Sequence, residues 1–276
     1  MRAIFVAKQL IGDGLYIQPS LEEWAKGHEG WEIDLLTNND HVACLYEGMG
    51  IPGMRVIFER EVLTDASRTA FMDKYIYDFE YTFDVSKAFA LGDQEKIHIS
   101  TAYAKLLGYD VVPRRVKYQP SDRDDHEKGL ILLSMQSMSC ASKSGKAPNK
   151  MLSWAHWLPI LTMCRQLGRV GVLGGPKDRV DLPVSEDEYY TGLPLEHVAR
   201  MLRDAKLLIT IDNGMGHLAA TQQTPTILFY PACLGLHWIV PSGNPNLVVF
   251  QMDPVRLQVA EAVLVVRKGI EQLWKD

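Results

Sequence analysis

The sequence lacks long apolar runs, paired cysteines and an excess of basic charge. No stretch of its 276 residues approaches the roughly 20 consecutive apolar positions of a membrane-spanning helix, which excludes an integral membrane protein. The chain has 4 cysteines and no Cys-x-x-Cys pair, which argues against a disulfide scaffold or a zinc finger. With 29 basic and 34 acidic residues it has no global attraction to nucleic acid. No secretory signal is recognisable, so we expect a cytoplasmic protein.

The sequence does contain an alternation of short β-rich runs and amphipathic stretches, which is typical of parallel βαβ units and predicts an α/β fold. A polar segment at 113–128 interrupts the alternation and predicts a linker. Two Rossmann-like domains, 1–120 and 121–276, are therefore expected to face each other across a cleft. The predicted strands are 3–7, 31–36, 54–58, 75–83 (alternating aromatics), 129–135, 170–173, 207–211, 226–230 and 247–250. The predicted helices are 19–27, 41–47, 99–107, 152–167, 195–204, 215–222 and 254–274.

The most informative segment is the apolar strand at 207–211, which is followed directly by Asp212-Asn213-Gly214-Met215-Gly216-His217. A strand that turns at once into a helix presents the first N–H groups of that helix, and its positive dipole end, to a ligand. The glycines allow a phosphate to approach the backbone, Asn213 can cap the helix, and His217 adds a donor one turn later. This pattern predicts an anion site; the alternative is a capped helix with a half-buried histidine.

The same segment resembles the signature Asp-(Ser/Thr)-Gly-x-x-His-Leu-x-Ala of the heptosyltransferase-like glycosyltransferases, glycosyltransferase family 9. Asn213 stands where the family has a hydroxyl residue. Three further blocks resemble the family in the same order along the chain. They are Gly12-Asp13 with Pro19 and Leu21, Lys150 with Trp157 seven residues later, and Val172 to Asp178 with its Gly-Gly-Pro.

The resemblance implies a GT-B architecture and an inverting transfer of a sugar from a nucleotide-diphosphate donor, for which ADP-heptose is the best-known example. It implies Asp13 as the general base that takes a proton from the acceptor hydroxyl. Lys150 would place its positive charge beside the diphosphate. Binding of the diphosphate is expected to need no metal or other cofactor. The remaining donor-binding candidates are the hydroxyls of Ser137 and Ser139, the N–H groups of Asn213, Gly214 and Met215, the side chain of His217, Asp178 at the ribose, and Asp212, which would orient the loop or touch donor hydroxyls.

Several alternatives stay open at this level. Asp13 lies between two glycines and fits a simple turn, and Asp178 fits an exposed surface turn. A nucleotide-sugar-binding module without activity, or a GT-B nucleotide-sugar epimerase, would share the same donor motifs. A dehydrogenase is disfavoured because no Gly-x-Gly-x-x-Gly follows the first strand. The expected acceptor is a glycolipid, a small molecule, a protein or a modified nucleic acid. Basic residues that would receive an anionic acceptor, or merely coat a solvated linker, are Arg114, Arg115, Lys117, Lys143 and Lys146.

Overall fold

The computed structural model describes residues 1–8, 11–59, 75–110, 116–137, 150–175, 184–185, 188–235 and 240–275. The chain divides into two compact units. Unit 1 comprises Met1–Gln119 and His237–Gly243, and unit 2 comprises Pro120–Leu236 and Asn244–Asp276. The assignment of 1–120 to an acceptor and 121–276 to a nucleotide sugar stays a prediction.

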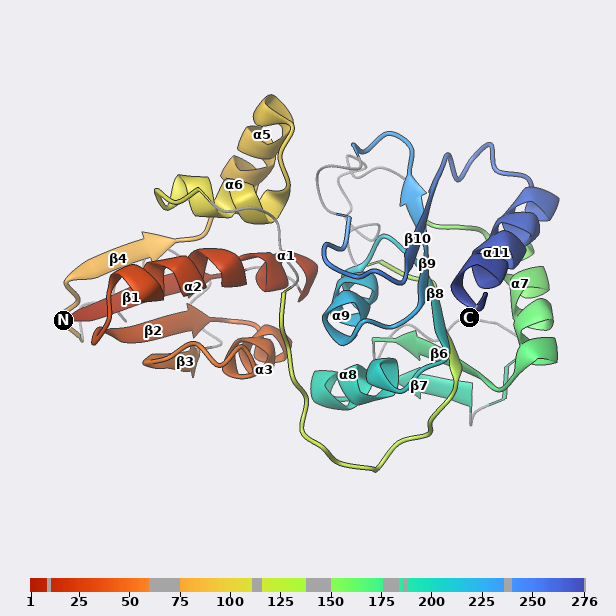
Figure 1. Cartoon of the computed structure of the whole chain (residues 1–276), viewed down its shortest axis with the longest axis horizontal. Coiled ribbons are helices and arrows are strands. Elements are labelled where there is room, and N and C mark those ends of the chain that lie inside the picture. The colour runs from red at the N-terminus through yellow and green to blue at the C-terminus, as the bar shows by residue number, and fades with distance from the viewer. Residues whose placement is uncertain are drawn as a thin grey trace. The chain divides into compact units, whose positions relative to one another are not determined.

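Unit 1 is built on a four-stranded parallel sheet in the order β3-β2-β1-β4, as the βαβ pattern predicted (Figure 1). Every residue of β1 after Arg2 is buried, and Phe5 packs edge-on against the ring of Trp24 from α2, with ring centroids 5.1 Å apart. The elements are β1 (Arg2–Ala7), α1 (Ile11–Tyr16), α2 (Gln18–Gly27), β2 (Glu32–Thr37), α3 (Asp40–Glu47), β3 (Met54–Phe58), β4 (Phe79–Thr82), α5 (Val85–Glu95) and α6 (Ile99–Leu106).

Two helices of unit 1 were not expected from the sequence. The glycine-flanked residues after β1 were predicted to form a loop, but Ile11–Tyr16 is the short helix α1. Helix α5 was also missed; its start is fixed by Asp84, whose carboxylate accepts hydrogen bonds from the N–H groups of Ser86 and Lys87. The predicted aromatic strand is shorter than expected and begins only at Phe79.

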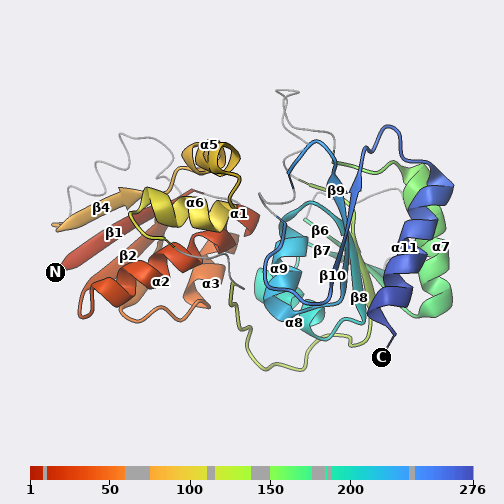
Figure 2. The same cartoon turned by 45° about the horizontal axis from the view of Figure 1, so that its top comes forward.

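Unit 2 is built on a six-stranded parallel sheet in the order β10-β9-β8-β5-β6-β7. Helices α7 and α11 lie on one side of this sheet and α8 and α9 on the other (Figures 1 and 2). The predicted α/β class with parallel sheets is therefore confirmed. The elements are β5 (Ile131–Ser134), α7 (Trp154–Leu167), β6 (Val170–Gly174), β7 (Tyr189–Thr191), α8 (Leu195–Arg203), β8 (Leu207–Ile211), α9 (Gly214–Gln222), β9 (Thr226–Pro231), β10 (Leu247–Met252) and α11 (Val259–Leu273).

The core of unit 2 lies between the sheet and the pair α7 and α11, where Trp157 and Phe229 are fully buried and meet edge to face. Burying large aromatic side chains contributes strongly to stability. Helix α11 begins at Val259 rather than at the predicted 254, because residues after Asp253 form a turn in which its carboxylate accepts the N–H of Val255 at 3.0 Å. No helix in the described ranges is long and apolar enough to cross a membrane.

The described part of the predicted linker, 116–128, forms no helix or strand. Two of its acidic residues pair with arginines of α8. Asp125 accepts two hydrogen bonds from the buried Arg200 at 3.0 and 3.1 Å, and Asp122 accepts one from Arg203 at 3.1 Å. Ion pairs between residues so far apart in sequence leave no local pattern, which explains why the sequence did not predict them.

Candidate functional site

The turn between β8 and α9 lies at the carboxyl end of the unit 2 sheet, between the ends of β9 and β5. Asn213 is the N-cap of α9, and its side-chain oxygen accepts hydrogen bonds from the N–H groups of Met215 at 3.0 Å and Gly216 at 3.3 Å. The predicted cap is confirmed. Because an N-cap fixes the entry of the chain into the helix, the first turn of α9 is held at the edge where parallel sheets bind ligands.

The amide nitrogen of Asn213 ties this turn to the neighbouring strand. It donates to the backbone oxygen of Gln136 at 2.8 Å and to the hydroxyl of Ser134 at 3.0 Å. Thr210 donates in turn to the Asn213 side-chain oxygen at 3.1 Å. A serine or threonine has one hydroxyl and no amide, so it cannot make the same set of bonds. Asn213 therefore joins the ends of β8 and β5 and holds the chain that leads to the predicted Ser137.

Lys150 and His217 are brought together by the carboxylate of Asp212, and we call these three residues the Asp212 cluster. The ammonium of Lys150 lies 2.5 Å from one carboxylate oxygen, and Nε2 of His217 lies 3.8 Å from the other. The Asp212 side chain is only 2% exposed and that of Lys150 11%. A carboxylate so deeply buried needs a cationic partner, and Lys150 supplies it.

The cluster and the helix start together have the composition of an anion site. An ammonium group has three N–H donors, and Asp212 accepts from one of them; among the described residues no other group accepts from Lys150. The N–H of Met215, predicted to reach a diphosphate, already donates to Asn213. The N–H of Gly214 has no partner in the part of the chain that the structure describes, and it lies at the positive end of α9.

Asp13 lies in the first turn of α1 in unit 1, where it is half-buried. The expected glycine loop around it is therefore wrong in form, although the residue still follows the carboxyl end of β1. Gly14 has a packing role: a Cβ at this position would lie 3.1 Å from the hydroxyl of Tyr46 and 3.1 Å from a methyl of Val42. An acidic residue in the first helical turn also interacts favourably with the helix dipole.

The remaining predicted residues divide between described and undescribed positions. Ser137 is half-buried just after β5. Lys117 is exposed, and its backbone N–H donates to the Gln18 side chain at 2.8 Å. Six predicted residues lie outside the described ranges: Ser139, Asp178, Arg114, Arg115, Lys143 and Lys146.

A polar cluster in unit 1 was missed by the sequence analysis. Asp34 on β2, with a side chain 3% exposed, accepts hydrogen bonds from Arg2 at 2.6 Å, Arg55 at 2.9 Å and the Tyr77 hydroxyl at 2.9 Å. Burial opposes ionisation of Asp34, but the hydrogen bonds from Arg55, Tyr77 and Arg2 outweigh it and lower its pKa. The partners come from two other strands, β1 and β3, and a loop, so only the strand register places them together.

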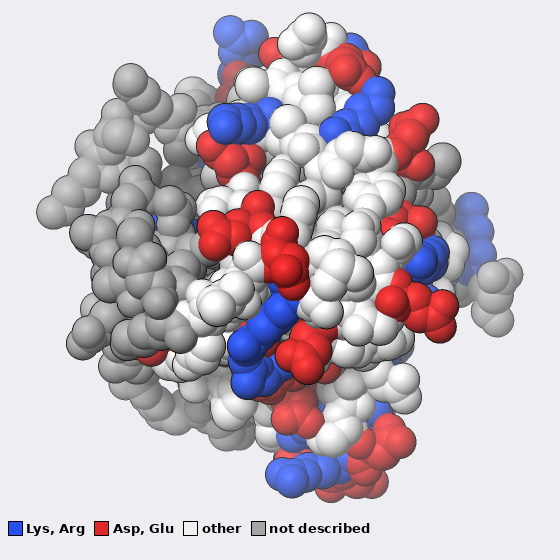
Figure 3. All heavy atoms as spheres, turned by 90° about the vertical axis from the view of Figure 1, so that its left-hand side faces the viewer, with Lys and Arg blue, Asp and Glu red and all other residues white. Residues whose placement is uncertain are grey.

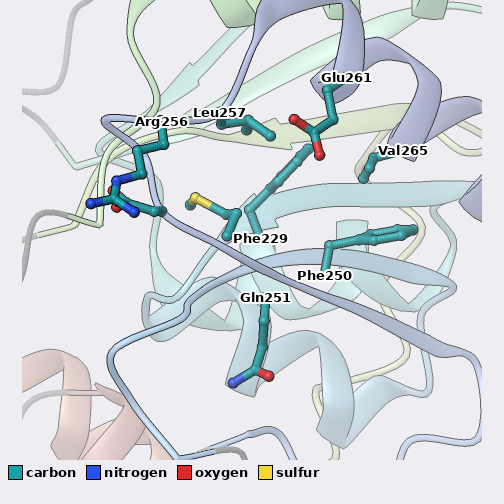
Figure 4. A pocket seen from close by; sticks show the side chains of 9 residues that line it. Phe229, Phe250, Gln251, Arg256, Leu257, Glu261 and Val265 are labelled. Atoms are coloured by element: carbon teal, nitrogen blue, oxygen red, sulfur yellow. The ribbon is translucent and has the colours of Figure 1, made fainter.

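The surface and the pocket of the described residues add two observations. On the face in Figure 3, Lys and Arg side chains are interspersed with Asp and Glu, and its described part shows no broad patch of one sign. A pocket of about 280 Å³ lies between β9, β10 and α11 in unit 2. Figure 4 shows the carboxylate of Glu261 directed towards the ring of Phe229, in a pocket that both apolar and charged side chains line. None of the predicted site residues lines this pocket.

Among the described residues, no group of three or more His, Cys, Asp and Glu side chains is arranged to hold a metal ion. The expectation that no metal is needed stays a prediction.

Comparison with known proteins gives one family match and several structural matches. Residues 137–238 match glycosyltransferase family 9 (heptosyltransferase). No curated protein matches the chain. The ADP-heptose lipopolysaccharide heptosyltransferase II of E. coli superposes with a TM-score of 0.69 at 14% identity and covers 99% of each chain. A family 9 glycosyltransferase from Veillonella parvula gives a TM-score of 0.70 at 16% identity, with 99% of this chain and 96% of the other covered.

A third structure is TibC from enterotoxigenic E. coli, described as a dodecameric, iron-containing heptosyltransferase and also solved with ADP-D-beta-D-heptose. Its TM-score is 0.69 at 16% identity, and 99% of this chain and 76% of TibC are covered. The resemblance to family 9 is confirmed by the family match, and the parallel-sheet α/β fold matches these GT-B structures. The family match supports a glycosyltransferase.

Proposed function

We propose that this protein is an inverting glycosyltransferase that moves a sugar from a nucleotide diphosphate to an acceptor hydroxyl. The proposal is supported by the segment that matches glycosyltransferase family 9 and by the heptosyltransferase-like fold. ADP-heptose is the proposed donor, because TibC, which shares the fold, was solved with that molecule. The observation that carries the proposal is the Asp212 cluster beside the capped start of α9.

The diphosphate is proposed to bind where positive charge and N–H donors meet. Lys150 contributes a charge that Asp212 holds in place, and α9 contributes its N-terminal dipole and the N–H of Gly214. Negative charge grows on the diphosphate as the bond to the sugar breaks. Groups fixed in position before the reaction stabilise that charge without further reorganisation. His217, on the other side of Asp212, is proposed to donate a hydrogen bond to the nucleotide sugar.

Asp13 is proposed as the general base. Its carboxylate takes the proton of the acceptor hydroxyl while the acceptor oxygen bonds to the anomeric carbon and the nucleoside diphosphate departs, so the configuration is inverted. The two roles fall on different units of the chain, Asp13 on unit 1 and Lys150 on unit 2. The proposed acceptor is a hydroxyl of a glycolipid, small molecule, protein or modified nucleic acid.

The role of Asp13 is tested by Asp13→Asn, which removes the base and keeps the size of the side chain. A thermal-shift screen with ADP, GDP, UDP, CDP and their sugars first identifies the donor, since a ligand of the native state raises its stability. Turnover is then measured as release of the nucleoside diphosphate when the sugar is transferred to water or to an added acceptor. We expect donor affinity within about twofold of wild type and turnover lower by about 10²-fold or more.

The matched control is Asp40→Asn, which changes another acidic residue in the first turn of a unit 1 helix. This variant is expected to turn over the donor like wild type. Normal turnover in Asp13→Asn would refute the assignment of the base. Tight binding of a nucleotide sugar with no release in wild type, across the acceptor classes, would favour a binding module instead of a transferase.

A further inference from the structure

The helices that pack against α1, which carries Asp13, contain buried hydroxyl groups. Helices α2, α3 and α6 pack against it. Ser20 on α2, Tyr46 on α3 and Thr101 on α6 each have a buried side-chain oxygen with no hydrogen-bond partner among the residues that the structure describes. Buried polar groups are nearly always paired in folded proteins, so such a group calls for a specific explanation.

The Tyr46 side chain reaches the backbone beside Asp13. Its side chain is completely buried, and its hydroxyl lies 3.1 Å from the position that a Cβ on Gly14 would occupy. Gly14 directly follows Asp13, and its lack of a side chain leaves the space that the phenol enters. A residue with a side chain at position 14 would therefore push Tyr46 away from α1.

The electrostatic surroundings keep Tyr46 protonated. Burial raises the pKa of Tyr46 well above its ordinary value of 10.0, and the neighbouring Tyr103 and the carboxylate of Asp13 raise it further. The hydroxyl therefore stays protonated and can donate a hydrogen bond at neutral pH. At the other end of α1, Tyr16 meets His98, whose pKa burial lowers to about 4, so that this imidazole is neutral.

We propose that Tyr46 is a positioning residue for Asp13: its hydroxyl donates a hydrogen bond to the Asp13 carboxylate and holds it in the orientation needed to take the acceptor proton. The inference rests on the proposed role of Asp13 as base. Hydrogen bonds of catalytic groups are often long in ligand-free structures and shorten in the working enzyme. A bond donated to the charged carboxylate favours its ionised form and so keeps the base ready at neutral pH.

The test is a pH titration of the Asp13 carboxyl group in the full chain, in which NMR of ¹³C-labelled aspartate monitors the ionisation of that group. The Asp13 signal is the one lost in Asp13→Asn. Tyr46→Phe is expected to move the midpoint of this signal to higher pH by about half a unit or more, a roughly threefold change in the proton dissociation constant. Tyr109→Phe is the matched control, because its hydroxyl lies by Gly27 on α2, and it is expected to leave the midpoint unchanged.

An unchanged Asp13 midpoint in Tyr46→Phe would overturn the inference. A purely structural role would show itself as a lower unfolding temperature with the same midpoint, whereas the proposed role moves the midpoint itself. The titration does not depend on turnover, so the two proposals fail separately. Normal turnover of Asp13→Asn refutes the catalytic base, and an unmoved midpoint refutes only the role of Tyr46.

Discussion

Asn213 gives a graded prediction, because its side chain makes two separable sets of hydrogen bonds. The oxygen caps α9, and the amide nitrogen joins the turn to Gln136 and Ser134. Asn213→Ser keeps a capping oxygen and loses both amide bonds. At about 1 kcal/mol for each bond, we expect a loss of about 2 kcal/mol in the free energy of unfolding. Asn213→Ala also loses the cap and is expected to lose about 1 kcal/mol more.

Asn213→Asp separates charge from hydrogen bonding. An aspartate still accepts from Met215 and Gly216, but it cannot donate to Gln136, and it brings a second carboxylate next to Asp212. Two unit charges 4 Å apart repel by about 4 kcal/mol at an effective dielectric constant of 20, only partly offset by the helix dipole. We therefore expect nucleotide-diphosphate affinity to fall by about 10-fold or more in this variant, against about threefold or less in Asn213→Ser.

The assays are urea unfolding, followed by circular dichroism, and calorimetric titration with the nucleoside diphosphate that binds wild type. The three variants should rank serine, alanine, aspartate in increasing loss of affinity. If Asn213→Ser is as stable as wild type and Asn213→Asp binds the nucleotide equally well, the amide does not position this turn and the turn does not bind the diphosphate.

Three further predictions concern Asp34, Gly171 and the metal dependence of nucleotide binding. Asp34→Asn is expected to lower the free energy of unfolding by about 3 kcal/mol above pH 4, because two arginines lose their carboxylate partner. The pKa of Asp34 is lowered from its ordinary 3.8, so the difference in stability from wild type should shrink as the pH falls through that lowered value. A difference that does not change with pH would contradict this prediction. Gly171→Ala should cost about 1–3 kcal/mol, because its Cβ would lie 2.8 Å from the Tyr190 ring, whereas Gly168→Ala, with its nearest atom at 3.8 Å, should cost less; equal urea midpoints would refute the clash. Treatment with EDTA should leave nucleotide affinity within about twofold, and a loss that Mg²⁺ restores would show that the diphosphate is held through a metal.

Local sequence patterns predicted the strand and the helix that form the site, but they did not predict the contacts between residues distant in sequence. The cap by Asn213 follows from its residue type at the end of an apolar strand, and the structure confirms it. The bond from Asn213 to Gln136 depends on β5 and β8 lying side by side, which no local pattern encodes. The helix around Asp13 was missed because its two glycines disfavour helix in isolation, while packing of Gly14 against Tyr46 and Val42 accounts for the helix in the fold.

The carboxylate of Asp34 illustrates the same limit in unit 1. Its partner Arg55 is recognisable only after the register of β2 and β3 pairs the two residues. Likewise, the acidic linker residues have the composition of a solvated segment, and only the fold brings Asp125 to Arg200 on α8. Ion pairs between residues distant in sequence are therefore one feature of this protein that the sequence did not predict.

The central claim is that Lys150 and the start of α9 hold the diphosphate of a nucleotide sugar. Its most direct test is calorimetric titration of the full chain with ADP, GDP, UDP and CDP, in wild type, Lys150→Ala and the control Lys206→Ala, whose ammonium lies over the ring of Trp274. Lys150→Arg, which keeps the charge beside Asp212, controls for loss of fold. We predict that wild type and Lys206→Ala bind one of these nucleotides equally well and that Lys150→Ala binds it about 10-fold or more weakly. Equal affinity in wild type and Lys150→Ala, or no binding of any of the four nucleotides by wild type, would contradict the account.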